Sequence, residues 1–509
     1  MLAKVFSCTT VGLEPYLIEV EVDVSSGLPH FDIVGLPDLS VKESKERVRT
    51  AIKNGGYIFP PRRIIVNLAP ADIKKEGPGF DLSIAVGILA ATKQLPLRHL
   101  RSYVLVGELS LDGTLRPVPG VLPMALFLQK LGGKGLIIPQ DNSREASLTP
   151  LNSYGFRNLH EVQRFLVKPE TSLPINRISF HEFIGQQDLS GPDLAEVKGQ
   201  NTAKRALEIA AAGGHNIFLV GSPGSGKSML ARCLPSILPP LTEQEALEVS
   251  EVYSVGGFLT PDRPLVTQRP FRSPHHTTSA SGMIGGGPVP KPGEVTLATH
   301  GVLFLDELPE YRRDVLESLR QPLEDHVVTL SRVHLTTTFP ARFQLAAAAN
   351  PCPCGYFGDP LKECTCTPYQ VDKYRSKVSG PLLDRIDIHI EVPRVTFQEL
   401  DQHGAAESSV QVRQRVIRAR KIQIQRFQGY GFSCNAMMGN KEVKKYCHLV
   451  LPAKKILQQA FQSMGFSARA YHRILRIART IADLAGSEQI ETAHVAEAIH
   501  YRSFDGNRS

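Results

Sequence analysis

The stretch NIFLVGSPGSGKS, residues 216–228, decides the fold that this sequence predicts. A short apolar run leads into a glycine-rich loop, and the loop opens an amphipathic segment that ends near residue 238. A loop of this pattern between a strand and a helix is typical of phosphate binding, because its backbone N–H groups can surround the phosphates of a nucleotide. A glycine-rich turn without a ligand is the alternative, but such a turn requires neither the full pattern nor the lysine. The predicted loop consists of Gly221, Ser222, Pro223, Gly224, Ser225, Gly226, Lys227 and Ser228.

ATP with Mg²⁺ is the ligand that this loop predicts. We expect the ammonium of Lys227 to reach the β- and γ-phosphates and the hydroxyl of Ser228 to hold Mg²⁺. The second half of such a site is an acid pair at the end of a neighbouring buried strand, and the sequence supplies VLFLDE at residues 302–307. Asp306 is expected to hold Mg²⁺ through water, and Glu307 to polarise the attacking water. A strand that ends in Asp-Glu is otherwise commonly a solvated turn, so this prediction rests on its pairing with the loop.

A third polar side chain follows another predicted strand, FQLAAAAN at residues 343–350. We expect Asn350 to lie beside the γ-phosphate at the tip of that strand and to help orient the attacking water. Short apolar runs alternate here with helical segments such as 227–238 and 312–325. This alternation predicts the α/β class, with a mostly parallel sheet buried on both faces.

Changes in pattern divide the 509 residues into three units and a linker. Residues 1–168 predict an α+β domain of alternating strands, with a helix that Asp38 can cap. A polar linker, 169–189, precedes the ATPase core at 190–395, and 396–509 predict an all-helical lid. The amino-terminal segment lacks the pattern of a signal peptide, and no segment is apolar over the ~18 residues of a membrane span. We therefore expect a cytoplasmic protein without a membrane partner.

Four of the eight cysteines fall in ANPCPCGYFGDPLKECTCTP, residues 349–368. In a reducing compartment, so tight a cluster indicates a metal more often than disulfides. Four thiolates close a tetrahedral Zn²⁺ site and leave no position open for water, which favours a structural role. Redox-active dithiols and free thiols are the alternatives, because C-x-C is not the usual zinc spacing. The predicted ligands of Zn²⁺, within a loop at 352–366, are Cys352, Cys354, Cys364 and Cys366.

Together these residues resemble the ComM/YifB family, which belongs to the magnesium-chelatase-like AAA+ ATPases. The resemblance covers essentially the whole chain, and it includes FRSPHHTTSASGMIGGG, SGPLLDRIDIHIEV and SARAYHRILRIARTIADL. It implies that Arg385 is an arginine finger which reaches the γ-phosphate of a neighbouring subunit. It also implies that Arg469, with Arg473 as the reserve candidate, is the second sensor of the lid. A guanidinium can stabilise the charge on a transferring phosphoryl group, although a surface salt bridge is the alternative for Arg473.

The family resemblance also implies a function. It implies a homo-hexameric ring that hydrolyses ATP and translocates on single-stranded and branched DNA, as a helicase that promotes branch migration during recombination in natural transformation. Other recombination proteins are possible partners. In related ring motors an insertion and a hairpin, here residues 269–294 and 326–340, point into the pore, which makes Lys291, Arg332 and His334 candidate contacts. His275 and His276 without nearby acids are expected to be loop residues, not metal ligands.

Charge gives the DNA hypothesis modest support. Lys and Arg number 58 against 50 Asp and Glu, so the chain carries a net charge of +8. Such a balance favours a polyanionic partner, although many basic proteins bind no nucleic acid. The predicted helix within 408–428 is strongly basic, with Arg413, Arg415, Arg418, Arg420 and Arg426.

The amino-terminal domain resembles the peptidase domain of the Lon family, which has the ribosomal S5 domain 2-like α+β fold. By alignment, Gly79 stands at the position of the family's catalytic serine and Leu122 at that of its lysine. Neither a nucleophile nor its base is present, so we do not expect a peptidase. The domain is expected to bind a partner or nucleic acid, against the alternative of plain surface charge, through Arg62, Arg63, Lys74 and Lys75.

Three rival functions follow from the same residues. A protein remodeller of the magnesium-chelatase type would use the ATPase on a partner protein, but we do not expect the fused Lon-like domain or the cysteine cluster in it. A Lon-like protease is contradicted by Gly79 and Leu122. A nucleotide-gated DNA-binding scaffold would bind ATP without turnover, so a measured rate of hydrolysis separates it from the motor.

Overall fold

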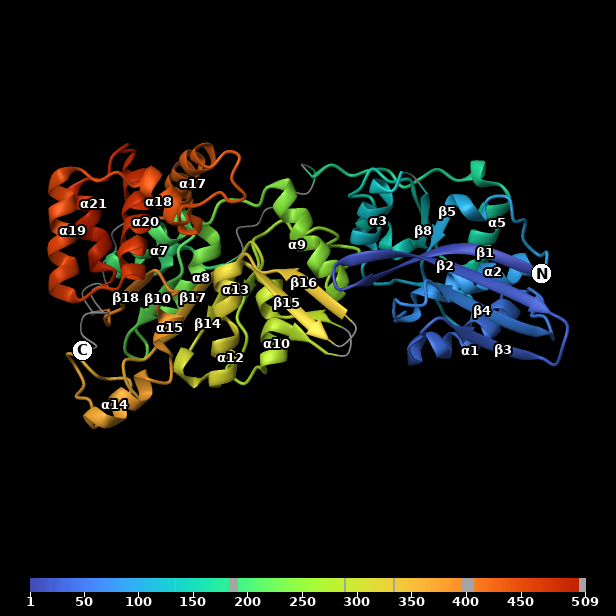
Figure 1. Cartoon of the computed structure of the whole chain (residues 1–509), viewed down its shortest axis with the longest axis horizontal. Coiled ribbons are helices and arrows are strands. Elements are labelled where there is room, and N and C mark those ends of the chain that lie inside the picture. The colour runs from blue at the N-terminus through green and yellow to red at the C-terminus, as the bar shows by residue number, and fades with distance from the viewer. Residues whose placement is uncertain are drawn as a thin grey trace.

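The computed structural model describes residues 1–132, 134–180, 182, 191–287, 290–332, 335–395 and 407–502. Figure 1 shows an elongated molecule, with the amino-terminal sheet at one end, a second sheet in the middle and a group of helices at the other end. No helix in these ranges is long and apolar enough to cross a membrane.

The amino-terminal part is built on a seven-stranded mixed sheet in the order β3-β4-β2-β1-β5-β8-β9. Its long strands pair in an antiparallel hairpin whose turn contains Gly12. The strands are β1 Leu2–Val11, β2 Glu14–Ser25, β3 His30–Val34, β4 Arg63–Ala69, β5 Tyr103–Leu105, β8 Gly135–Pro139 and β9 Ser153–Phe156, with the separate pair β6 Glu108–Leu109 and β7 Leu115–Arg116.

Helices cover this sheet, and two of them show why the sequence folds as it does. The carboxylate of Asp38 accepts a hydrogen bond of 2.7 Å from the amide of Val41, which confirms the predicted cap of α1. Every residue of α2 is buried between the strands and α1, so its sequence has no polar face and carries no helical period. The helices are α1 Leu39–Asn54, α2 Asp81–Ala91, α3 Val121–Lys130, α4 Ser143–Ala146 and α5 Leu159–Val167.

The central sheet is parallel, as the alternating pattern predicts, in the order β11-β14-β17-β10-β18. Apolar side chains fill both of its faces. Its strands are β11 Phe271–Arg272, β14 Val302–Leu305, β17 Gln344–Ala349, β10 Ile217–Val220 and β18 Ile388–Glu391. The short pair β12 Gly285–Gly286 with β13 Lys291–Pro292 and the hairpin β15 Val327–Arg332 with β16 Leu335–Pro340 lie outside this sheet.

One predicted helix of the central part is divided. Residues 312–325 form α12 and α13, which are separated at Leu319. The proline ring at Pro322 conflicts with the carbonyl four residues earlier, at Ser318, and this is where α12 ends. The helices of the central part are α7 Asn201–Gly213, α8 Lys227–Ile237, α9 Glu243–Gly256, α10 Ala280–Ile284, α11 Glu294–Leu297, α12 Arg313–Ser318, α13 Arg320–Asp325, α14 Pro368–Arg375 and α15 Gly380–Leu383.

The carboxy-terminal helices share a core with the central sheet. One continuous apolar cluster runs from α7 and β10 through α8 to α17 and α20. Ser408 and Ser467 cap the amino-terminal ends of α17 and α20. The helices are α17 Ser409–Arg426, α18 Asn440–Tyr446, α19 Leu451–Met464, α20 Ala468–Ala485 and α21 Thr492–His500.

The amino-terminal part is docked on the central part at two places, both visible in Figure 1. At the first, α3 packs against α9, and the hydroxyl of Ser254 donates to the buried carboxyl of Glu145, whose pKa is raised by burial. The amide of Gly120 also donates to the Ser254 carbonyl at 3.1 Å. At the second, the β1–β2 turn lies against the β15–β16 hairpin, where a Cβ added to Gly12 would stand 2.1 Å from Cγ2 of Thr337.

The second contact can be tested with matched glycines. Gly12→Ala should lower the free energy of unfolding by about 1–3 kcal/mol more than Gly56→Ala does, because only at Gly12 does the new methyl meet packed atoms. Both glycines have a left-handed φ, +60° and +81°, so the backbone strain of the two variants is similar. Chemical unfolding of both variants measures the difference. Adding Thr337→Ser, which removes Cγ2, should recover most of the loss at Gly12, and an equal cost for both alanines would contradict the contact.

Candidate functional site

The predicted phosphate-binding loop lies where the parallel sheet brings three strand ends together. The loop follows β10, Asn350 follows β17, and Asp306 follows β14. In the sheet, β17 lies between the other two strands. Because parallel strands end at the same edge, this order places the loop, the asparagine and the acid side by side.

Lys227 fills the centre of the loop. It is 8% exposed, and its Nζ donates to the carbonyl oxygens of Gly221 at 2.7 Å and Ser222 at 2.9 Å. The amide oxygen of Asn350 is 3.3 Å from the same Nζ. Burial lowers the pKa of Lys227, while Asp306 and Glu307 oppose the shift. The structure thus brings the lysine and Asn350 together.

The hydroxyl of Ser228 donates to Oδ2 of Asp306 at 2.6 Å. Helix α8 begins directly after Gly226, whose φ of +91° only glycine adopts readily. The N–H groups of the first turn of α8 have no acceptor within the helix and lie next to the loop. Hydroxyl and carboxylate oxygens are ligands that Mg²⁺ accepts, and an anion is favoured at the start of a helix. These side chains fit a nucleotide with Mg²⁺.

The side chain of Glu307 is accessible to a reactant. It is 57% exposed, and its backbone has a φ of +51°, which turns the chain sharply at the end of β14. Its Oε2 is 3.9 Å from Nδ1 of His276, and the imidazole packs edge-on against Tyr311. The hydroxyl of Tyr311 donates to the carbonyl of Pro274 at 2.6 Å, which fixes the histidine loop to this corner.

His276 is a loop residue, as the sequence predicts, but the sequence reasoning missed its position beside Glu307. The sequence contains only a weak signal for the position of His276. His276 follows β11, which is the neighbour of β14 in the sheet, so the loop after β11 ends at the same edge as Glu307. Strand β11 has two residues and shows no period that the sequence could reveal.

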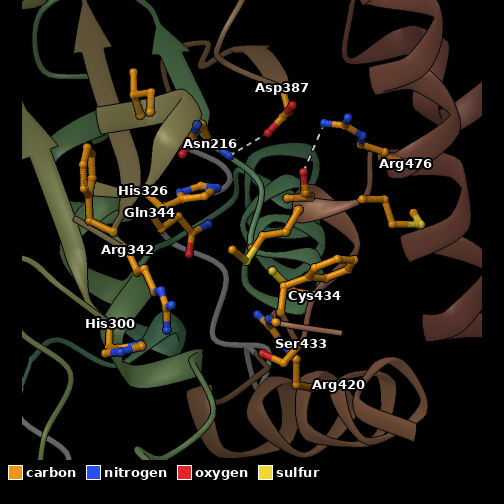
Figure 2. Close-up of a pocket in the computed structure, with 18 of the residues that line it drawn as sticks. Asn216, His300, His326, Arg342, Gln344, Asp387, Arg420, Ser433, Cys434 and Arg476 are labelled. Carbon is orange, nitrogen blue, oxygen red and sulfur yellow. Dashed lines mark hydrogen bonds between the residues drawn. The ribbon is translucent and has the colours of Figure 1, made fainter. Parts of the chain in front are cut away.

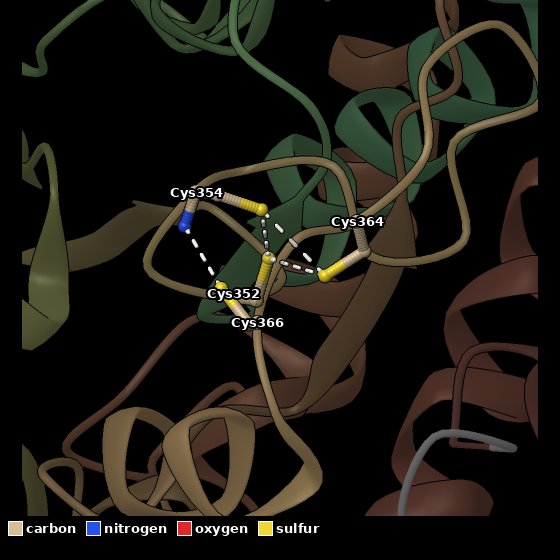
Figure 3. Close-up of side chains that lie close together, drawn as sticks. All are labelled: Cys352, Cys354, Cys364 and Cys366. Atoms are coloured by element: carbon tan, nitrogen blue, oxygen red, sulfur yellow. Dashed lines mark hydrogen bonds between the residues drawn. The ribbon is translucent and has the colours of Figure 1, made fainter.

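The four clustered cysteines converge, as Figure 3 shows. The Sγ atoms of Cys352, Cys354 and Cys364 are 3.4–3.7 Å apart, and all four Sγ atoms lie within 4.8 Å of one another. The amide of Cys354 also donates to Sγ of Cys366 at 3.4 Å. A tetrahedral site with Zn–S bonds of about 2.3 Å requires sulfur separations of about 3.8 Å. The arrangement is therefore a possible four-cysteine metal site.

The candidate arginine finger and second sensor lie away from the loop of their own chain. Arg385 is 7% exposed, donates to the carbonyl of Pro381 at 2.6 Å and pairs with Glu324 at 2.5 Å. Arg385, Arg469 and Arg473 line one cavity of about 1190 Å³ between the central part and the helical part. No residue of the phosphate-binding loop is among the described residues that line it.

Figure 2 shows this cavity, with Arg342 and His300 on the side of the central part and Arg476 on the side of the helices. The lining is basic, with seven arginines against five acidic residues. Asp387 is buried, which raises its pKa, but Arg473, His215 and Arg476 outweigh that effect and hold the pKa below its usual value. Arg473 donates to Oδ1 of Asp387 at 2.8 Å, so Arg473 has a structural partner while Arg469 is exposed.

The basic helix α17 is less available to DNA than its sequence suggests. The arginines bond to the carbonyls of Leu238 and Ala211 and to the carboxylates of Glu208, Glu407 and Asp483. These contacts attach α17 to α7, α8 and α20, whereas Arg418 is exposed. The residues that make these bonds are Arg413, Arg415, Arg420 and Arg426.

The candidate contact residues of the amino-terminal part include both buried and exposed side chains. Lys75 is fully buried and its Nζ donates to the carbonyl of Pro70, so the prediction of a surface contact was wrong for this residue. Arg62, Arg63 and Lys74 are exposed. Lys291 of the insertion is exposed as well, whereas His334 and the side chain of Arg332 lie outside the described residues.

At the positions of the Lon dyad, Gly79 offers no side chain and Leu122 is fully buried. Leu122 belongs to an apolar cluster that joins the two parts, together with Leu148, Leu241, Ala246 and Leu265. The start of α3 is thus covered by the central part.

Three protein-family models match the chain. The model described as magnesium chelatase, subunit ChlI, matches residues 193–400. A second model, subunit ChlI of Mg-chelatase, matches 20–142, and a third, for the carboxy-terminal part of subunit ChlI, matches 406–502. Together the matches extend over most of the chain.

Individual relatives agree with these models. Competence protein ComM of Haemophilus influenzae is 46% identical over 509 residues, which is 99% of this chain and 97% of that protein. The uncharacterized protein YifB of Escherichia coli K12 is 42% identical over 514 residues, with the same coverage. Lon protease 2 of Bacillus subtilis is 25% identical over 189 residues, which is 34% of each chain.

Proposed function

The chain belongs to the ComM/YifB family of magnesium-chelatase-like proteins, and from this premise we propose that it is an ATP-driven hexameric DNA translocase. Its function would be to promote branch migration during homologous recombination in natural transformation. The name of the competence protein supports the link to competence, and branch migration follows from the family resemblance. The observation that carries the ATPase part is the meeting of Lys227, Asn350 and the Ser228–Asp306 pair at one sheet edge.

Each residue at this edge has a chemical role in the proposal. Lys227, now bonded to loop carbonyls, would transfer its hydrogen bonds to the phosphates, and its buried setting strengthens that attraction. Ser228 and Asp306 would hold Mg²⁺, which neutralises charge on the phosphate oxygens when bound. Glu307 would accept a proton from the attacking water, and Asn350 would orient that water.

The basic cavity supports action between subunits. Arg385 and Arg469 share a cavity that the phosphate-binding loop of the same chain does not line, so the proposal places both against the nucleotide of a neighbour. A cation that reaches a transferring phosphoryl group stabilises its developing charge. A trans-acting finger requires a closed arrangement of subunits, and the hexamer follows from the family resemblance.

A magnesium-chelatase-like remodeller is the second candidate, and the three family models favour it. Such a protein would couple the same hydrolysis to a partner protein. The internal bonds of α17 remove part of the support for DNA, which leaves the net charge of +8 and the ComM relative. The effect of DNA on ATP turnover therefore decides between the two candidates.

We expect single-stranded or branched DNA to raise the rate of ATP hydrolysis several-fold over the rate without DNA. Glu307→Gln should lower kcat by about 100-fold or more, because the general base is lost, while ATP binding is retained. Steady-state hydrolysis with no DNA, single-stranded DNA and forked DNA measures both effects. A rate that no DNA changes would favour the remodeller, and turnover that survives in Glu307→Gln would contradict the assigned base.

Arg385→Ala should lower kcat by about 1000-fold, because the transition state loses the guanidinium. A subunit that carries Lys227→Ala keeps its finger but loses its own site. Mixing the two inactive proteins should therefore restore part of the turnover, because intact fingers then meet intact loops. Arg418→Ala, at an exposed arginine of α17, is the control and should keep the full rate measured without DNA. If mixing restores nothing, Arg385 acts within its own chain or only in folding.

The cysteine cluster is proposed to hold one structural Zn²⁺ per chain, because the four sulfurs have nearly the separations of a tetrahedral site. Metal analysis should find one zinc in the purified protein. Cys364→Ser should abolish it, whereas Cys447→Ser, at a cysteine outside the cluster, should not. A reduced protein that contains no metal and refuses added zinc would leave the redox-active dithiol as the explanation.

A further inference from the structure

The cysteine loop, residues 352–366, lies directly against the phosphate-binding loop. Gly355 faces Pro223 so closely that an added Cβ would stand 2.6 Å from both Cγ and Cδ of the proline ring. Carbon atoms in ordinary contact are about 3.5–4.0 Å apart. A glycine is therefore required at this point of the cysteine loop for the two loops to touch.

A second contact joins the same two loops through polar groups. The side chain of Ser222 interacts with the carboxylate of Asp359 and, with other groups, holds the pKa of Asp359 below its usual value. Oδ1 of Asp359 also accepts from the amides of Leu361 and Lys362 at 2.9 and 3.1 Å. The carboxylate therefore fixes the turn of its own loop and the start of the phosphate-binding loop at the same time.

Arg394 connects this carboxylate to the end of the central sheet. Its Nε is 2.9 Å from Oδ2 of Asp359, whose side chain is fully buried, and its guanidinium lies 5.3 Å from the centre of the Tyr356 ring. The chain before Arg394 also touches the phosphate-binding loop, because a Cβ on Gly221 would stand 2.3 Å from the carbonyl oxygen of Val392. The first half of the phosphate-binding loop is thus held between the cysteine loop and the exit of β18.

We infer that the metal-bound cysteine loop is a positioning element for the nucleotide site, and that the affinity for ATP depends on its contact with Pro223 and Ser222. This inference rests on the proposed binding of ATP at Gly221–Ser228. The loop between the cysteines contains no helix or strand, so the metal is what would fix its backbone. Without that constraint, Gly355 and Asp359 lose their fixed positions and the phosphate-binding loop loses one of its two supports.

Two glycines of the cysteine loop provide a matched test. Gly355 and Gly358 have similar left-handed φ values, +85° and +78°, so alanine adds similar backbone strain at both. Only Gly355 faces packed atoms, since nothing lies within 4 Å of a Cβ at Gly358. Gly355→Ala should weaken the binding of a non-hydrolysable ATP analogue about tenfold with its zinc content unchanged. Gly358→Ala should change neither quantity.

A double variant separates this contact from a general disturbance. Pro223→Ala removes the two ring atoms that the new methyl would meet, so Gly355→Ala with Pro223→Ala should bind the analogue about as tightly as Pro223→Ala alone. Zinc-free Cys364→Ser should show a loss of affinity at least as large as that of Gly355→Ala. Equilibrium titrations of the analogue, with metal analysis of each sample, measure all of these values.

The outcomes distinguish the inference from the function on which it rests. If the wild-type chain does not bind the analogue, the proposed ATP site is wrong. If the wild-type chain binds it and both Gly355→Ala and Cys364→Ser bind equally well, the site stands and the positioning role is overturned. Full affinity together with lost subunit assembly or lost DNA stimulation would also overturn it, and would assign the cysteine loop to a neighbouring subunit or to DNA.

Discussion

The carboxyl edge of the parallel central sheet is the constraint on which the whole site depends. Strands β14, β17 and β10 are adjacent and parallel, so the residues that follow them must meet. Parallel order brings Asn350 to 3.3 Å from Lys227, although 123 residues separate the two, and brings Asp306 to 2.6 Å from Ser228. The sheet is buried on both faces, so these positions cannot shift without disturbing two cores.

The same constraint explains which parts of the site the sequence could predict. The phosphate-binding loop is a local pattern of eight residues with a strand before it and a helix after it, and the acid pair ends an apolar run. The position of His276 beside Glu307 could not be predicted in this way. It depends on the pairing of β11 with β14, in which Phe271 lies opposite Val302, 31 residues further along the chain. Helix α2 was not predicted for a related reason. A helix that is buried on all sides has no polar face, so its sequence shows no helical period.

The sequence predicts the net charge of the chain, but it does not predict which charged side chains are exposed. The arginines of α17 read as a basic face, yet Arg415 and Arg426 pair with carboxylates from α7 and α20, far away in the sequence. Removal of one partner from a buried pair leaves the other charge uncompensated, so these arginines are tied to the folding of the lid. Lys75 is a similar case, because its neighbour Lys74 is exposed and only the tertiary structure distinguishes them. In contrast, Arg385 and Arg469 line the cavity between the central part and the helical part.

The docking of the amino-terminal part explains why an apolar residue stands at position 122. Leu122 lies in the first turn of α3, at the surface that packs on the central part, and it is fully buried among leucines from both parts. A lysine there would have to leave water for an apolar contact, at a cost that depresses its pKa or opens the interface. Leucine instead contributes to that contact, and the Leu122 amide donates at 2.9 Å to Glu145, the same carboxyl that accepts from Ser254. Leucine at this position therefore helps α3 to support α9 of the central part.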